Sequence, residues 1–202
     1  MAAMTIDLQP GFADKVLSAQ STFRAVMEAM ARPGQVMAVD AEVGRPPSMM
    51  AGVAAIALTL LDQDTPLWLD PAFMAAPDVS AWLKFHTGAP VVAQPEHAHF
   101  ALIAAPAMLR DLTSFALGTL EYPDRSTTLI LQVPSLARGR TYHLRGPGID
   151  GSTSLSATIE PADLLTRLSI NESLFPRGID VILVDDHSLV AIPRTTRMSA
   201  GV

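Results

Sequence analysis

The segment that decides the fold lies near the end of the chain and reads FPRGIDVILVDDHSLVAIPRTT, residues 175–196. Two apolar runs, residues 179–184 and 189–192, flank the polar turn DDHS, and this pattern predicts an antiparallel hairpin that closes the sheet. A proline and an arginine stand before the first run, and a second such pair follows the other run. Because the two strands run in opposite directions, Arg177 and Arg194 are expected at the same end of the sheet.

A second informative stretch reads GTLEYPDRSTTLILQV, residues 118–133. It predicts a loop over residues 119–126, followed by a strand over residues 127–133 whose aliphatic and β-branched run is typical of a buried central position. The other expected helices are residues 14–32, residues 49–61 capped by Ser48, a helix capped by Asp78 and ended by Gly88, residues 107–117, and residues 162–172 begun by Pro161. The other expected strands are residues 35–39, 65–69, 89–93, 99–104 and 141–144, with 89–93 and 99–104 as a hairpin-like pair.

Helical and extended patterns alternate along the chain, which favours an α/β protein with a layered α/β/α arrangement and a mixed, partly antiparallel sheet. A length of 202 residues suits one domain, with residues 1–13 and 197–202 expected as flexible ends. Hydrophobic residues make up 49% of the chain and charged residues 17%. Two explanations stay open: some apolar surface is reserved for partners, or Ala-rich helices are buried between layers.

Composition excludes several classes of function. The formal net charge of −6, with no run of Lys or Arg, argues against nucleic-acid binding. The absence of Cys leaves no thiolate nucleophile, disulfide or iron–sulfur ligand. The N-terminus does not resemble a secretory signal, and no apolar run approaches the roughly 20 residues that span a bilayer, so we expect a cytoplasmic protein that does not enter a membrane. Phosphate-loop, dinucleotide and nucleophile-elbow motifs are missing from the sequence.

The arginines beside the strands are the best candidates for binding. A guanidinium group grips a phosphate or carboxylate through two parallel hydrogen bonds and keeps its charge. Arg125 precedes a buried strand, Arg177 and Arg194 flank the hairpin, and Thr195 adds a hydroxyl group. A phosphorylated sugar or a carboxylate of a partner protein would suit this set. The alternative is that each arginine pairs with a local acid (Glu121, Asp124 or Asp180) and fixes a loop or a dimer contact.

The histidines offer weaker signals. His86, at an expected helix end, suits a general base or a phosphate contact, but a histidine in a last turn also complements the helix dipole. Glu96-His97-Ala98-His99 places two histidines at the spacing of one strand face without an identified third ligand. We therefore predict no metal site, and no nucleophilic trio can be assembled, so no catalytic residue is predicted.

Three further stretches add a family resemblance. They are STFRAVMEAMARPG (residues 21–34), TLLDQDTPLWL (residues 59–69) and FHTGAPVVAQPEHAHFA (residues 85–101). Together with the two stretches above, they resemble the PhnH family, the H subunit of the bacterial carbon–phosphorus lyase system, over nearly the whole chain. The resemblance implies a reduced form of the pyridoxal-phosphate-transferase fold. The cofactor itself needs a lysine, and Lys15 and Lys84 do not follow a late strand, so no cofactor is expected.

The resemblance also implies a function and partners. It implies a subunit of the complex that, with G, I and J subunits, forms α-D-ribose 1-methylphosphonate 5-triphosphate from methylphosphonate and a nucleoside triphosphate. The expected role is a noncatalytic scaffold that forms a homodimer and docks on the I subunit. The alternative is an independent enzyme that binds a nucleotide or a phosphorylated ribose through the arginines and His86.

Overall fold

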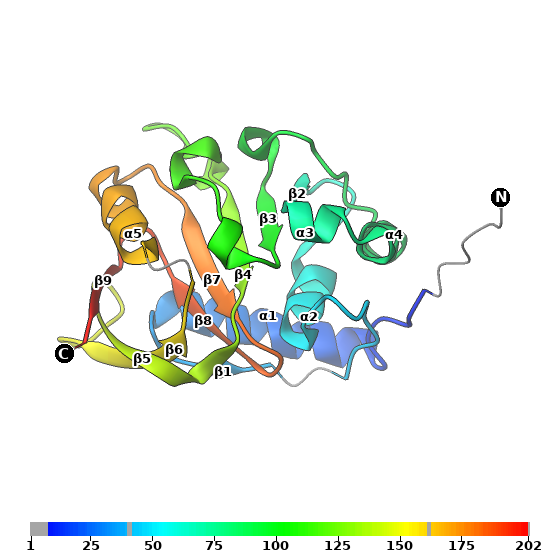
Figure 1. The fold of residues 1–202 in the computed structure, drawn as a ribbon, viewed down its shortest axis with the longest axis horizontal. Helices are drawn as coiled ribbons and strands as arrows, with labels where there is room; N and C mark the ends of the chain where they lie inside the picture. The colour runs from blue at the N-terminus through cyan, green and yellow to red at the C-terminus, as the bar shows by residue number, and fades with distance from the viewer. Residues whose placement is uncertain (1–7, 40–41, 161–162, 202) are drawn as a thin grey trace.

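The computed structural model describes residues 8–39, 42–160 and 163–201 as a layered α/β fold built around one large sheet (Figure 1). The helices are α1 (Lys15–Ala31), α2 (Ala51–Leu60), α3 (Pro71–Met74), α4 (Pro77–Thr87) and α5 (Leu164–Ser173). The strands are β1 (Met37–Ala38), β2 (Leu67–Leu69), β3 (Phe100–Ile103), β4 (Thr128–Gln132), β5 (Ser135–Arg145), β6 (Thr153–Thr158), β7 (Asp180–Val184), β8 (Ser188–Ile192) and β9 (Arg197–Ala200). The α/β class with a mixed sheet is as the sequence predicts.

The larger sheet has six strands in the order β1-β8-β7-β4-β3-β2. Strands β2, β3, β4 and β7 are parallel, whereas β8 runs antiparallel to both β7 and β1. The pairing of Val181 with Ile192 confirms the closing hairpin. A smaller antiparallel sheet, in the order β6-β5-β9, lies below α5 in Figure 1.

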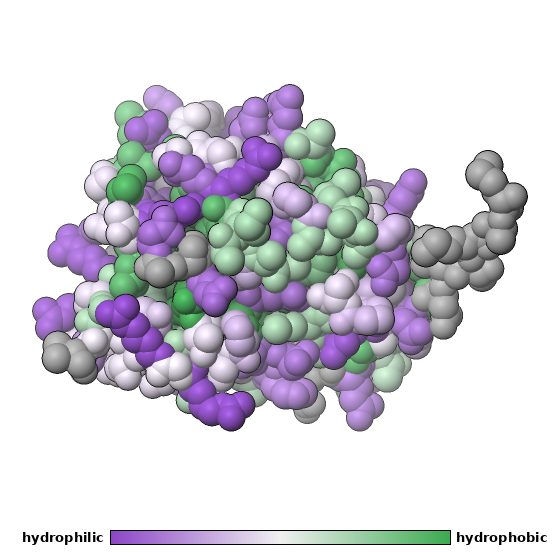
Figure 2. All heavy atoms as spheres, viewed as in Figure 1, coloured by the Kyte–Doolittle hydropathy of each residue, from purple (hydrophilic) through white to green (hydrophobic). Residues whose placement is uncertain are grey.

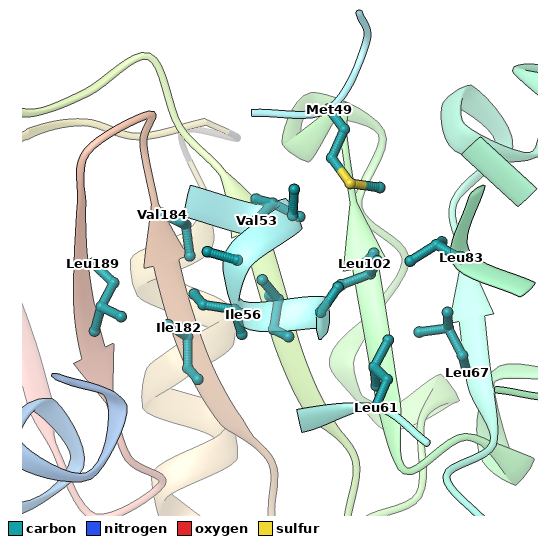
Figure 3. Packing of buried hydrophobic residues seen from close by; sticks show 14 of the residues in the cluster. Met49, Val53, Ile56, Leu61, Leu67, Leu83, Leu102, Ile182, Val184 and Leu189 are labelled. Atoms are coloured by element: carbon teal, nitrogen blue, oxygen red, sulfur yellow. The ribbon is translucent and has the colours of Figure 1, made fainter. Parts of the chain in front are cut away.

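Two hydrophobic cores lie on opposite faces of the large sheet, because successive side chains of a strand point to opposite faces. On one face, Ile182 and Val184 pack with α1, α2 and α4, and Figure 3 shows Val53 and Ile56 of α2 against them. On the other face, Val181 and Leu183 pack with α5 and the small sheet. Burial of β7 on both sides explains its uninterrupted apolar sequence.

Helix α2 begins at Ala51 and not at the expected cap Ser48. The Met50 N–H donates to Gln132 Oε1 at 2.6 Å, and the Ala51 N–H donates to Asp186 Oδ1 at 3.0 Å. The first amides of the helix are thus satisfied by side chains at the end of β4 and in the β7–β8 turn, which are distant in sequence. The prediction of Ser48 was wrong because tertiary contacts supply what a local cap would supply.

Two other local predictions were wrong. Residues 89–93 and 99–104 do not form a hairpin, because β3 is parallel to β2 and β4, and Val91 makes only a parallel bridge with Leu67. Helices α3 and α4 instead connect β2 to β3 in a parallel crossover. The expected helix 107–117 is replaced by two short 3₁₀ helices, Pro106–Met108 and Leu112–Ser114. The side chain of Asp111 accepts the Thr113 N–H at 3.1 Å and starts a new turn there.

Near both ends of the chain, the described residues pair with other segments. Phe12 is buried and forms a bridge with Val43, and β9 pairs with β5 over residues 197–200. The expected start at Pro161 lies outside the described residues, and α5 begins at Leu164. No helix in the three described ranges is long and apolar enough to cross a bilayer. On the face drawn in Figure 2, apolar residues gather over α3 and the segment after β3, among polar ones.

Asp185, which follows β7, joins the two sheets. Its Oδ1 accepts the N–H groups of His187 and Ser188 at 3.0 and 2.8 Å, and its Oδ2 accepts the Leu136 N–H of β5 at 3.0 Å. Partial burial by itself raises the pKa of the carboxyl group, but the hydrogen bonds from His187, Ser188 and Leu136 outweigh it. The pKa of Asp185 therefore lies below its ordinary value of 3.8.

We expect Asp185→Asn to lower the free energy of unfolding at pH 7 by about 1 kcal/mol, because an amide oxygen accepts these hydrogen bonds less strongly than a carboxylate. Since the folded pKa is depressed, the carboxylate stabilises the protein above pH 3.8 and this contribution disappears as the pH falls through the folded pKa. The difference between wild type and variant should therefore shrink between pH 6 and the acid limit of folding. Urea unfolding across this range measures it, with Asp150→Asn, at an exposed position, as the control. A difference that grows toward acid would contradict the assignment.

Candidate functional site at the amino ends of the parallel strands

The three arginines that the sequence singled out as binding candidates all lie next to strands at one edge of the large sheet. The loops that lead into β4 and β7 carry Arg125 and Arg177, and Arg194 follows β8, whose end lies beside the start of β7. This is the edge where the parallel strands begin. The expectation that Arg177 and Arg194 share one end of the sheet therefore agrees with the strand pairing.

Arg194 forms an ion pair with Asp180 at the start of β7. Its Nη2 lies 2.5 Å from Asp180 Oδ2 and its Nε lies 3.2 Å from Oδ1, and the Arg194 N–H donates to the same Oδ1 at 2.8 Å. The side chains of Arg194 and Asp180 are only 13% and 14% exposed. The pair is held by two charge-assisted side-chain hydrogen bonds in a mostly buried place, and such a geometry is stronger than that of a surface ion pair.

The same guanidinium group holds two more segments. Its Nη1 donates to the carbonyl oxygens of Pro123 and Pro176 at 2.8 and 3.4 Å, and its Nη2 donates to Ser126 Oγ at 2.6 Å. An arginine side chain has five N–H donors, and these contacts use five. Arg194 therefore ties the loops before β4 and β7 to the end of β8, and it has no donor left for a ligand.

Arg125 and Arg177 are placed differently. The guanidinium carbon of Arg125 lies 4.2 Å from the centre of the Tyr122 ring, and both side chains are exposed. Arg177 is exposed as well, and its guanidinium group bonds to no residue within the described ranges. These two arginines, unlike Arg194, keep donors that can bind an anion.

A shallow cleft of about 380 Å³ opens at this edge. Its lining residues come from the three segments that Arg194 holds together: Pro123, Asp124, Phe175, Pro176, Asp180, Pro193, Arg194 and Thr195. Phe175, which lines the cleft, is 63% exposed. Leu120 and Tyr122, which shortly precede Pro123 in the sequence, are 67% and 51% exposed. The cleft is mostly apolar, with Thr195 half-buried at its edge, so the site combines a proline-rich floor with exposed aromatic rings.

His86 is not part of this cleft. It lies in the last turn of α4, where its Nε2 is 3.0 Å from the carbonyl oxygen of Gln9, and the Trp82 indole donates to the same oxygen at 3.0 Å. A carbonyl oxygen only accepts, so the Nε2 of His86 carries the proton. Its ring packs between Trp82 and Phe85, at 4.8 and 4.9 Å between ring centres. His86 thus fixes the N-terminal segment on α4.

Metal-binding residues are not brought together either. Across residues 8–39, 42–160 and 163–201, no group of three His, Cys, Asp or Glu side chains could hold a metal ion. His97 lies in a 3₁₀ helix and His99 follows it, so their spacing is not that of one strand face.

Comparison with known proteins decides the family. The family model described as bacterial phosphonate metabolism protein (PhnH) matches residues 10–199. The chain is 38% identical over 198 residues, 98% of each chain, to the alpha-D-ribose 1-methylphosphonate 5-triphosphate synthase subunit PhnH of Rhizobium meliloti (strain 1021). It is also 30% identical over 183 residues, 89% of this chain and 85% of the relative, to the putative C-P lyase subunit protein HtxG of Stutzerimonas stutzeri. The chain belongs to the PhnH family.

The opposite edge of the sheet, at the carboxyl ends of the parallel strands, also bears on the function of this PhnH family member, although the sequence did not indicate it. In open parallel sheets, ligands usually bind outside the carboxyl ends of the strands. Here that place is filled by the chain itself: Asp186 accepts from the first turn of α2 and lies 3.4 Å from Arg45, and Gln132 bonds to Met50. These are contacts between segments distant in sequence, and no local motif signals them.

Arg194→Gln is expected to lower the free energy of unfolding by about 2–4 kcal/mol, because it leaves the mostly buried carboxylate of Asp180 without its charged partner. Arg177→Gln, a change of the same type at an exposed and unpaired position, should stay within about 0.5 kcal/mol of wild type. Urea unfolding followed by circular dichroism compares the two. Equal stabilities of the two variants would show that the contacts of Arg194 contribute little.

Proposed function

We propose that this chain is a noncatalytic subunit of a bacterial carbon–phosphorus lyase core complex and supports the synthesis of α-D-ribose 1-methylphosphonate 5-triphosphate from methylphosphonate and a nucleoside triphosphate. The observation that carries the proposal is the 38% identity, over 98% of both chains, to a relative named as a subunit of that synthase. The second relative, named as a putative C-P lyase subunit, supports the same pathway. The complex would assemble in the cytoplasm with G, I and J subunits.

Three features of the described residues support a noncatalytic role. The five donors of Arg194 are used inside the chain. The carboxyl edge of the parallel strands, where an open α/β sheet usually binds ligands, is closed by Asp186 and Gln132. His86 holds the N-terminal segment and does not face the arginines. Arg194, His86 and the carboxyl edge thus all make structural contacts within the chain.

The cleft at the amino ends of the strands is the proposed docking surface for the I subunit. Exposed Leu120, Tyr122 and Phe175 supply apolar contact area beside the proline-rich floor. Arg125 and Arg177 add unpaired positive charge at the rim, which suits acidic side chains on a partner. Aromatic and arginine side chains are the residue types that dominate binding energy in protein interfaces.

The double variant Tyr122→Ser/Phe175→Ser is expected to weaken association with co-expressed G, I and J subunits by at least about tenfold, because it removes two exposed aromatic contacts. Native mass spectrometry of the purified complexes measures the loss of this subunit. Met108→Ser is the matched control, because Met108 is 72% exposed but follows β3 at the opposite edge of the sheet.

An equal loss with Met108→Ser would contradict the assigned surface. A wild-type chain that stays apart from all three subunits would contradict the proposal itself and favour the alternative, in which the chain is an independent enzyme and Arg125 and Arg177 bind a nucleotide or a phosphorylated ribose.

Helix α1 offers a surface for the proposed homodimer. Val16, Phe23 and Met27 are 64%, 49% and 54% exposed and follow one another along the outer side of the helix at intervals of seven and four residues. A twofold contact needs a surface that is complementary to itself, and a straight apolar stripe can pair with its own copy in antiparallel fashion. The concave cleft at the sheet edge does not have this property, so it suits a different protein.

Phe23→Glu is expected to convert the isolated chain from dimer to monomer, because two symmetry-related carboxylates would face each other across the axis. Sedimentation velocity at several protein concentrations measures the change. Phe85→Glu is the control, because Phe85 is 68% exposed on a different helix, α4. A dimer that persists with Phe23→Glu, or dissociates with Phe85→Glu, would exclude α1 as the contact.

A further inference from the structure

The loop between β5 and β6, residues 146–152, contains the single Asp-Gly pair of the sequence, Asp150-Gly151. Aspartate before glycine is the dipeptide at which a protein backbone rearranges most readily, because glycine has no side chain to hinder attack by its own backbone nitrogen. A fold suppresses this reaction where hydrogen bonds hold the pair in place. The contacts of the loop therefore decide whether the pair is reactive.

Both ends of the loop are held. Gly148 has a φ of +81°, and a Cβ there would lie 2.3 Å from the Ala31 carbonyl oxygen at the end of α1. The Ile149 N–H donates to the Gly146 carbonyl oxygen at 3.1 Å. On the other side of the loop, Thr153 already pairs with β5. Three residues remain between these fixed points.

Residues 150–152 lack such contacts. All three are exposed, and they make no hydrogen bond or ion pair with any residue that the structure describes. Gly151 has a φ of +65°, and no heavy atom lies within 4 Å of the position that a Cβ would take. A segment without hydrogen bonds rearranges at almost no cost in free energy. The Asp150 side chain and the Gly151 nitrogen can therefore meet by local rotation, while the rest of the chain stays folded.

The other sites at which this chemistry occurs are more hindered. Each of the other aspartates precedes a residue that has a side chain. Asn171, the single asparagine of the sequence, is 3% exposed, and its side chain bonds to the N–H and carbonyl groups of Ile179, both at 2.9 Å. Asp186 precedes His187, whose N–H donates to Asp185 Oδ1 at 3.0 Å. The loop thus combines a reactive pair with a backbone that is free to move.

We infer that Asp150-Gly151 is a site of spontaneous modification, at which the folded chain converts aspartate to isoaspartate. The Gly151 nitrogen forms a bond to Asp150 Cγ, and the hydroxyl of the carboxyl group leaves with the amide proton as water, which closes a five-membered succinimide ring. Water then opens the ring. Addition at Cγ restores aspartate. Addition at the backbone carbonyl carbon breaks its bond to nitrogen, so the main chain runs through the side chain and a free carboxylate remains on Cα.

The reaction requires no oxidant, cofactor or second protein, and it is slow, so freshly purified protein carries aspartate at this position. Isoaspartate adds one methylene group to the main chain of a loop whose two ends are fixed. The inference does not rest on the proposed role in assembly, because residues 150–152 belong neither to the arginine cleft nor to the exposed stripe of α1.

Storage of the purified full chain for several weeks at neutral pH, well below its melting temperature, tests the site. Trypsin releases residues 146–167 as one peptide by cutting after Arg145 and Arg167. We expect a second form of this peptide with unchanged mass, which protein isoaspartate methyltransferase labels and whose fragmentation by electron transfer places isoaspartate at residue 150. Asp163, in the same peptide, should stay unmodified. The rate in the folded chain should lie within about tenfold of the rate in guanidinium chloride, because the fold does not protect the pair.

Three variants test the chemistry. Asp150→Glu keeps the charge but would have to close a six-membered ring, so the labelled form should disappear. Asp150→Asn should react at least about tenfold faster and gain one mass unit, because an amide reacts at neutral pH whereas a carboxyl group reacts only when protonated. Asp64→Glu, at another exposed acid followed by threonine, is the matched control and should leave the yield unchanged. Circular dichroism shows that each stored sample is still folded.

A folded chain that stays unmodified while the denatured chain converts would overturn the inference, because the fold would then protect the pair. Isoaspartate that persists in Asp150→Glu, or that disappears in Asp64→Glu, would overturn the assigned position and with it the inference. None of these outcomes touches the proposed assembly, which is measured with fresh protein. A fresh chain that fails to assemble would likewise leave the modification to be judged by peptide mapping.

Discussion

The arrangement of the loops at the amino ends of the parallel strands depends on the contacts of the Arg194 side chain. Because β7 is central and β8 is its antiparallel neighbour, the loops before β4 and β7 have to meet the end of β8 at one place. Loop segments carry backbone carbonyl groups that lose water there, and one guanidinium group satisfies those of Pro123 and Pro176 while it neutralises Asp180. The proline-rich cleft exists because these three segments are held together.

The two faces of the large sheet are covered by different kinds of layer. One face carries the helices α1, α2 and α4, as the parallel β2–α3–α4–β3 crossover requires. The other face has α5 and a second, antiparallel sheet in place of a full helical layer. Asp185 bonds to Leu136 at the point where the chain passes from the first sheet to the second. A pocket of about 230 Å³ lined by Tyr142 and Leu164 lies in this second layer.

Sequence patterns predicted the elements whose signals are strong and local. The hairpin of β7 and β8, the strand β4 and the helices α1 and α4 follow from apolar runs and, for the end of α4, from Gly88 at a left-handed turn. The expected cap Asp78 was wrong, because α4 already begins at Pro77 after Ala76 and Asp78 lies inside its first turn. Strands β6 and β9 were missed, because their alternating polar residues resemble loop sequence and only pairing with β5 makes them strands. The shared edge of Arg177 and Arg194 was predictable from strand direction. The pairing of Arg194 with Asp180 was predicted only as one of two alternatives. The side chains that cap α2 were not predicted at all. Both sets of contacts depend on where distant segments lie in the folded chain.

The two ends of the parallel strands have opposite chemistry, and this contrast argues for a structural role. At the carboxyl edge, the first turn of α2 presents backbone amides and the positive end of a helix dipole, the usual setting for a phosphate. Asp186 occupies it, and Arg45 lies beside the same carboxylate. A phosphate would have to displace a carboxylate that is tethered to the fold and therefore always present at high local concentration. At the amino edge, by contrast, the cleft is open and bordered by exposed rings and free arginines. The filled carboxyl edge and the open amino edge therefore both support the proposal that this chain contacts other proteins.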